Sequence, residues 1–184
     1  VPDLDDWIPW ALDNDMPIEL IAFLRFRPEF LWDFQPSAEI TQQSPCPRTC
    51  AAAGRLYARL QAANGTIPED MRATVTFAAI AGAAGVSFAS EFLGFARVFS
   101  QLPNPDAVLM DPAGSPVPTD PSALYALCGA LAIRASSGNV AALVAYANRL
   151  PAEFSVLLIR DARHISAKQG DPIDNTRPFV EWTV

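Results

Sequence analysis

The stretch Ser44-Pro45-Cys46-Pro47-Arg48-Thr49 precedes a run, Cys50 to Leu60, in which Ala, Leu and Arg predominate. Proline fixes φ ahead of a first helical turn and the run has high helix propensity, so the stretch predicts a helix that begins beside Arg48. The N-terminus of a helix favours an anion, and a guanidinium group there can pair with two oxygens at once. Arg48 is therefore a candidate phosphate ligand. The stretch leaves open an arginine that caps the preceding loop or pairs with a surface carboxylate.

Helical patterns on both sides of this stretch predict the fold class. Apolar residues recur at spacings of three and four, as in Phe88, Phe92, Phe95 and Phe99, and Pro, Gly and Asn separate the periodic segments. No segment combines sustained alternation of polar and apolar residues with β-branched residues and hairpin turns. The sequence therefore predicts an all-α helical bundle, with helices over residues 3–13, 17–27, 48–63, 66–82, 87–102, 120–135, 140–150 and 151–163.

Four other segments receive different predictions. Residues 35–47 are polar and contain prolines, and residues 103–121 contain six prolines, so both are predicted to be loops. The aromatic residues of segment 28–34 predict a turn that fills part of a core. The apolar tail Phe179-Val180-Glu181-Trp182 is expected to pack on the body of the protein.

Composition restricts the classes of function. The chain has 184 residues, a net charge of −7 and one lysine, Lys168, and half of its residues are apolar, so it is globular and large enough to bury a sizeable core. The negative charge argues against general binding to nucleic acid or anionic membranes. We expect a cytoplasmic protein, because no signal peptide is visible and no apolar run of 18 residues is free of charge. The first residue is not methionine, which predicts that the chain is a piece of something longer.

Residues that could carry chemistry are few. Three cysteines, Cys46, Cys50 and Cys128, cannot form a disulfide framework, and with the single histidine, His164, they offer no zinc set, so we expect reduced thiols. A Ser/His/Asp or Cys/His nucleophile would need His164, which is predicted to lie just beyond a helix C-terminus. No metal site or nucleophilic catalytic centre is expected.

Acid–base catalysis and phosphate loops have equally little support. Glu153 with Asp161, or Glu91 with Asp106, could act as acid and base, but their spacing is that of ordinary helix-surface acids. The sequence contains no G-x-x-x-x-G-K-[ST] phosphate loop and no G-x-G-x-x-G turn after a strand. A small helical enzyme that uses Glu153 or Asp161 therefore remains only a minor alternative, and no residue is assigned as catalytic.

The order of segments resembles a known family. Two helices, a loop, Ser44-x-x-Pro47-Arg48, a helix, and then Asn64-Gly65-Thr66-Ile67-Pro68-Glu69-Asp70-Met71 before another helix are similar to the C-terminal lid of MoxR-like AAA+ ATPases. Residues 5–34, with Leu24-Arg25-Phe26-Arg27-Pro28-Glu29, resemble the corresponding region of bacterial and prophage AAA-family ATPases. The rest is similar to the extension after that lid, in motifs such as Glu91-Phe92-Leu93-x-Phe95, Leu102-Pro103-x-Pro105-Asp106, Ala123–Leu127, Arg149-Leu150-Pro151-x-Glu153-Phe154 and Trp182.

The resemblance implies a function and a division of the chain. It implies a lid-like helical subdomain over residues 1–82 and a helical extension over residues 83–184, with Arg48 as the sensor-2 arginine that contacts nucleotide. Cys46 departs from the family pattern, because it interrupts the tighter Ser-Pro-Arg spacing. The implied cofactors, ATP and Mg²⁺, would be held by an upstream core domain that this chain lacks.

Partners follow from the same resemblance. They would be that upstream core, neighbouring subunits of a ring and a protein client, with no nucleic acid and no membrane, and the chain alone would have no ATPase activity. The alternative from a different class is a stand-alone helical protein–protein interaction module, with a binding groove between the Phe-rich helices and the loop 103–121.

Overall fold

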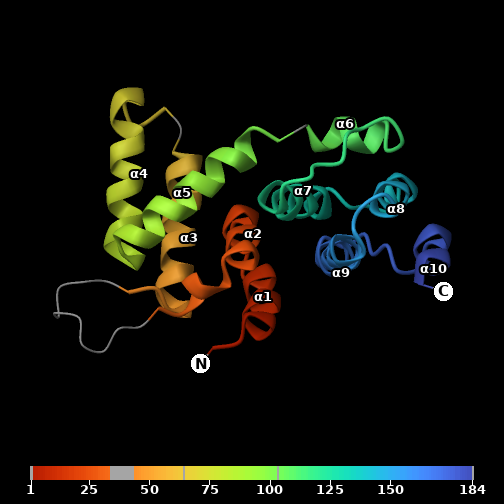
Figure 1. Ribbon diagram of the computed structural model, residues 1–184, viewed down its shortest axis with the longest axis horizontal. Coiled ribbons are helices and arrows are strands. Elements are labelled where there is room, and N and C mark those ends of the chain that lie inside the picture. Colours follow the sequence, from red (N-terminus) through yellow and green to blue (C-terminus); the bar gives the residue numbers. More distant parts are fainter. Residues whose placement is uncertain (1, 34–43, 64, 103, 184) are drawn as a thin grey trace. The chain divides into compact units, whose positions relative to one another are not determined.

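The computed structural model describes residues 2–33, 44–63, 65–102 and 104–183, and its regular structure is entirely helical in these ranges (Figure 1). The predicted all-α class is thereby confirmed. Residues 35–43 of the predicted loop 35–47 lie outside the described residues, as does Asn64. The elements in chain order are α1 (Leu4–Asp13), α2 (Ile18–Phe26), the 3-10 helix η1 (Pro28–Leu31), α3 (Pro47–Ala62), α4 (Glu69–Ala84), α5 (Val86–Ser100), α6 (Pro105–Met110), α7 (Pro121–Ile133), α8 (Val140–Ala147), α9 (Ala152–Lys168) and α10 (Arg177–Thr183).

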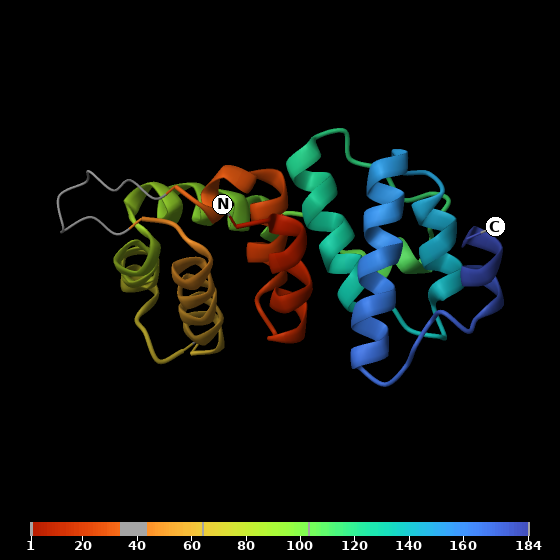
Figure 2. The same ribbon diagram turned by 90° about the horizontal axis from the view of Figure 1, so that it is seen from below.

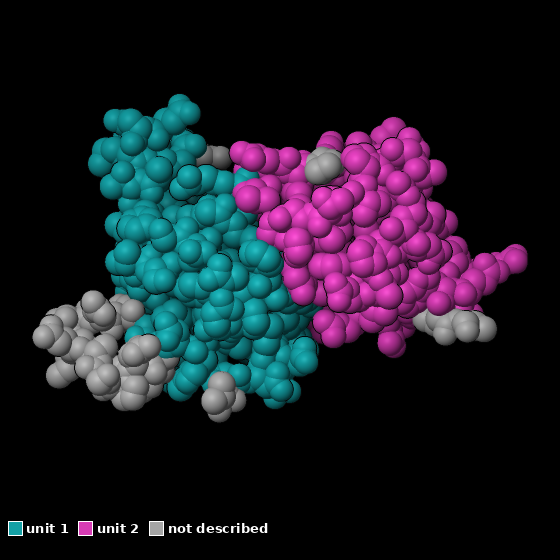
Figure 3. Space-filling model, in the orientation of Figure 1, with its two compact units in different colours: residues 1–97 teal, residues 98–184 magenta. Residues whose placement is uncertain are grey.

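The helices form two compact units, residues 1–97 and 98–184, which Figure 3 colours separately. The sequence placed the boundary between residues 82 and 83, a position that lies within α4. The difference comes from α5, whose Phe88, Phe92 and Phe95 pack around Phe23 of α2 and so join most of this helix to the first unit. The assignment of the two parts to lid and extension stays a prediction.

The core of the first unit is aromatic. The Phe23 ring of α2 lies 5.5–5.8 Å, between centroids, from the rings of Phe30, Phe88, Phe92 and Phe95. All five side chains are buried, and rings at such separations attract one another beyond the gain from burial alone. Because Phe30 belongs to η1, the predicted role of the aromatic turn as a core plug is borne out for Phe30 and Leu31, whereas Trp32 is exposed.

Two helices of this unit approach each other closely at a glycine. A Cβ atom on Gly54 of α3 would lie 2.6 Å from Cδ2 of Leu20 and 3.4 Å from Cδ of Pro17, so any larger residue would force the buried Leu20 side chain to move. On its other side α3 packs along α4, and the two helices lie side by side in both ribbon views (Figures 1 and 2). These contacts fix the position of α3, whose first turn carries Arg48.

The second unit is built on α7 and α9, which pack along each other with α8 beside α9 (Figure 2). Its core is mostly aliphatic, and the Tyr146 hydroxyl, which reaches the carbonyl oxygen of Pro116 at 2.8 Å, ties a loop to it. The predicted docking of the tail is confirmed, because Phe179 is buried and Trp182 packs against the same core. The buried members of this core include Val108, Leu124, Leu127, Leu131, Val140, Leu143, Phe154, Leu158, Ile159 and Ile173.

Three local predictions were wrong. Residues 105–110 of the supposed loop form α6, because Pro105 occupies the first turn, where its missing N–H costs nothing, and the Asn104 side chain accepts a hydrogen bond from Asp106 N. Helix α4 begins at Glu69, after Pro68, and not at residue 66. Helix α9 continues to Lys168, so His164 lies within it and not beyond its end.

Within the described residues, no helix combines the length and the hydropathy needed to span a bilayer.

Candidate functional site

The N-terminus of α3 is capped by a reciprocal pair of hydrogen bonds between Cys46 and Thr49. Cys46 has extended backbone geometry, and its N–H donates to the Thr49 hydroxyl oxygen at 2.8 Å, while the Thr49 backbone N–H points to the Cys46 sulfur. The Thr49 hydroxyl also lies 3.1 Å from the carbonyl oxygen of Ser44, to which it can donate. Pro47 is the first helical residue. The sequence-predicted start beside Arg48 is therefore confirmed, with the cap formed by Cys46.

The same turn is fastened to η1 and the segment after it. The Cys50 thiol, fully buried one turn into α3, donates to the Phe30 carbonyl oxygen at 3.3 Å. The Asp33 backbone N–H donates to the Pro45 carbonyl oxygen at 3.1 Å. These contacts fix the position of the first turn of α3. The backbone of Arg48, which lies in this turn, is therefore held in place as well.

Arg48 is the second residue of α3, and its side chain is exposed. Within the described residues no hydrogen bond or ion pair engages its guanidinium group, so no surface carboxylate is paired with it there. The backbone N–H groups of this first turn are already used: Pro47 has none, and those of Arg48 and Thr49 are directed at the Cys46 thiol. What the start of the helix still offers an anion is the helix dipole, which is positive at this end. An anion bound here would therefore meet both the guanidinium group and the start of the helix.

The two thiols of this turn differ in acidity. Burial raises the pKa of the Cys46 thiol, but the hydrogen bonds from Thr49, the backbone N–H groups of Thr49 and Arg48 and the Arg48 charge outweigh it and leave the pKa below its ordinary value. Burial, with a smaller contribution from Cys46, raises the pKa of Cys50 to about 12. The hydrogen bonds of the cap, with a smaller contribution from the Arg48 charge, thus favour the thiolate form of Cys46.

The other candidates belong to other elements and do not pair with one another. Asp161 of α9 is buried beside Arg160, at 3.7 Å, whereas Glu153 is exposed eight residues earlier, about 12 Å away along the helix, so the two do not form an acid–base pair. Glu91 and Asp106 likewise have separate cationic partners, Arg27 at 3.1 Å and Arg134 at 2.8 Å.

Metal ligands are not clustered in the described ranges of the chain, where no group of three His, Cys, Asp or Glu side chains could hold an ion. Cys128 lies in the second unit, where its thiol is directed at the Phe154 carbonyl oxygen at 3.7 Å. His164 is half-buried within α9. These placements leave the start of α3 as the candidate site.

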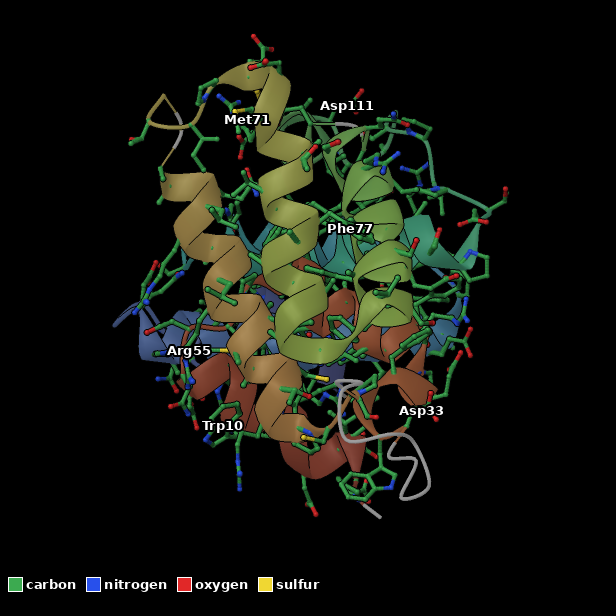
Figure 4. All side chains as sticks on the ribbon, turned by 90° about the vertical axis from the view of Figure 1, so that its left-hand side faces the viewer. Trp10, Asp33, Arg55, Met71, Phe77 and Asp111 are labelled. Atoms are coloured by element: carbon green, nitrogen blue, oxygen red, sulfur yellow. The ribbon has the colours of Figure 1, made fainter. Side chains whose placement is uncertain are left out.

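The structure adds two residues that the sequence-based search did not single out. Arg55 and Arg59 are exposed on α3, seven and eleven residues after Arg48, so all three point to nearly the same side of the helix. Figure 4 shows Arg55 on the outer side of α3, away from α4. We call these three residues the arginine stripe. Their spacing was visible in the sequence, but only the observed burial of the opposite face shows that this side is free.

No protein-family model, curated protein or solved structure matches this chain.

Proposed function

We propose that this chain is the non-catalytic helical part of a MoxR-like AAA+ ATPase, in which Arg48 contacts the γ-phosphate of a nucleotide held by a separate core domain. The proposal joins the sequence resemblance around Ser44–Met71 to the position of Arg48. Such a protein acts in the cytoplasm as a ring of subunits on a protein client. The core domain would supply the phosphate loop and hold ATP and Mg²⁺, which this chain cannot do alone.

The observation that carries the proposal is the placement of Arg48 at the start of α3. Its guanidinium group is exposed, has no ion-pair partner among the described residues, and stands at the positive end of the helix dipole. A planar guanidinium can pair with two phosphate oxygens and stabilise the charge that they carry in phosphoryl transfer. Loss of the γ-phosphate would remove this contact, which is how Arg48 would distinguish ATP from ADP.

The test uses the full-length protein that contains this chain together with its nucleotide-binding core. Arg48→Ala is expected to lower ATP turnover by about a hundredfold or more, because stabilising charge on a transferred phosphoryl group is worth orders of magnitude in rate. Arg48→Lys keeps the charge but not the planar fork, so it should fall between wild type and alanine. Arg59→Ala, on the same helix but about 16 Å farther along it, should leave turnover unchanged. Wild-type turnover in Arg48→Ala would refute the proposal.

A second candidate function is that of a helical interaction module, favoured by the outer face of α4. Phe77 is 36% exposed on this helix (Figure 4) and lies within residues 73–90, which contain no charged side chain, whereas Met71, 53% exposed, lies about 120° around the helix beside Arg72. Uncharged exposed faces with large apolar residues are typical of docking surfaces. The Phe-rich face of α5 is not available for a binding groove, because Phe88, Phe92 and Phe95 are buried. Phe77→Asp should abolish capture of a partner without loss of the helical fold, and unchanged capture would exclude this face.

A further inference from the structure

The arginine stripe (Arg48, Arg55 and Arg59) is longer than a phosphate site needs. Its members lie seven and four residues apart, so they share one side of α3 and span about 16 Å along the helix axis. Alanines occupy neighbouring positions of the same face, with Ala52 half-buried and Ala58 and Ala62 exposed. Because alanine side chains are short, they leave room between the arginines, and a segment of another protein could approach the helix backbone closely there.

No charge within the described residues neutralises this stripe. Helix α3 contains no Asp or Glu, and none of its three arginines forms an ion pair or hydrogen bond with a described residue. Several arginines elsewhere have carboxylate partners, such as Arg27 with Glu91, Arg134 with Asp106 and Arg177 with Glu181, although partly exposed Arg72 of α4 has none among the described residues. The chain as a whole carries a net charge of −7, so three cations on one helix face without a carboxylate partner stand out locally.

We propose that the arginine stripe is a docking surface for an acidic segment of a partner protein, which lies along α3 with its carboxylates against the guanidinium groups. Carboxylates match the planar fork of arginine and can accept two hydrogen bonds from each group. A helical segment with acidic residues four and seven residues apart would place its charges at the same intervals as the stripe.

Charge favours a protein segment over nucleic acid. A nucleic acid extends its phosphates well beyond 16 Å, and the acidic remainder of this chain would repel them. A short acidic segment would contact only the stripe and not the acidic surface around it. The proposal shares Arg48 with the nucleotide contact, but Arg55 and Arg59 lie about 10 and 16 Å farther along the helix, out of reach of a phosphate bound at its start, so these two residues test the stripe by itself.

The probe is a fluorescein-labelled, alanine-rich helical peptide with glutamates four and seven residues apart, titrated with the full chain and followed by fluorescence anisotropy. Binding is expected at low salt and should weaken steeply as salt is raised, since exposed charges are screened. Arg55→Glu/Arg59→Glu should weaken binding by about a hundredfold, because the substitution removes the attraction of two guanidinium groups and adds the repulsion of two carboxylates. Arg55→Gln/Arg59→Gln should give a smaller loss of the same kind, and circular dichroism would verify that each variant is folded.

The matched control is Arg160→Glu/Arg177→Glu, which changes the net charge equally at two exposed arginines of the second unit. It should weaken binding by no more than about threefold. Equal losses in the two double variants, or no binding of the peptide at low salt, would overturn the proposal. Tighter binding of a single-stranded oligonucleotide of the same charge, lost in Arg55→Glu/Arg59→Glu, would also overturn it in favour of nucleic acid. ATP turnover of the full-length protein should be unchanged by the stripe variant, which separates this proposal from that for Arg48.

Discussion

The two compact units differ in whether their exposed arginines have partners within the same unit. In the second unit exposed arginines are tied to its own surface, as Arg134 is to Asp106, Arg163 to Asp174 at 3.6 Å and Arg149 to the Pro112 carbonyl oxygen. In the first unit α3 presents three arginines that no described residue neutralises. Surface ion pairs contribute little to stability, so the difference bears on recognition more than on folding. Both proposals for anion recognition therefore rest on the first unit.

The cores differ as well. Aromatic rings fill the first unit around Phe23, whereas leucine, alanine and valine predominate in the second. Removal of a large ring at the centre of a cluster loses many contacts at once. In an aliphatic core the same buried area is divided among several smaller side chains, so each substitution loses less. The first unit therefore concentrates its stability in fewer side chains.

The largest effects are expected from substitutions that destabilise the core of one unit and leave the core of the other intact. Phe23→Ala should lower the free energy of unfolding of the first unit by about 3–5 kcal/mol, because it opens a cavity among four rings. Leu131→Ala, fully buried in the second unit, should cost that unit about 2–5 kcal/mol. Urea titrations would follow Trp182 fluorescence in the second unit and, in a Trp182→Phe background, the remaining tryptophans in the first. Identical shifts of both transitions in each variant would show one cooperative body.

A pair of glycine substitutions sharpens the comparison within the first unit. Gly54→Ala should destabilise it by about 1–3 kcal/mol, because the new Cβ would lie 2.6 Å from buried Leu20. Gly82→Ala, in α4 with no atom within 4 Å of the new Cβ, should stabilise it by about 0.5–1 kcal/mol through helix propensity. Thermal melts of the two variants would test this, and equal signs for the two would contradict the close approach of α3 to α2.

The smallest effect concerns a helix cap of the second unit. The Asp120 side chain accepts hydrogen bonds from Ser122 N and Ala123 N at the start of α7, so Asp120→Ala should cost about 1 kcal/mol. Hydrogen bonds from the Ser122 hydroxyl and from Ala123 N lower the pKa of Asp120 below its ordinary value of 3.8. The folded state thus favours the carboxylate, and the advantage holds above pH 3.8 and is lost as the pH falls through the lowered pKa. Unfolding measured from pH 7 to pH 2 should show wild type and Asp120→Ala converging in acid; a constant difference would contradict the assignment.

Much of the fold was predictable because its signals are local. Prolines and capping residues at Pro17, Pro47 and Asp120 predicted where helices begin, and the spacing of Phe88, Phe92 and Phe95 predicted the buried face of α5. Helix α6 was missed because a count of prolines over residues 103–121 hid the favourable position of Pro105 in a first turn. For the candidate site, the helix start at Arg48 was predictable, whereas the fastening of that turn by Cys50 and Phe30 joins residues far apart in sequence.

The sequence alone determined the helical class, the start of α3 and the positions of its three arginines, since propensity, capping and spacing act within a few residues. Only the tertiary structure decided which helices share a core, and so placed the division between units at residue 97, beyond the glycines of segment 82–85. It also decided which side of α3 is buried against α2 and α4 and which side exposes the arginine stripe. Burial depends on contacts between segments distant along the chain, and the pattern of α3, with alanines around the helix, did not specify them.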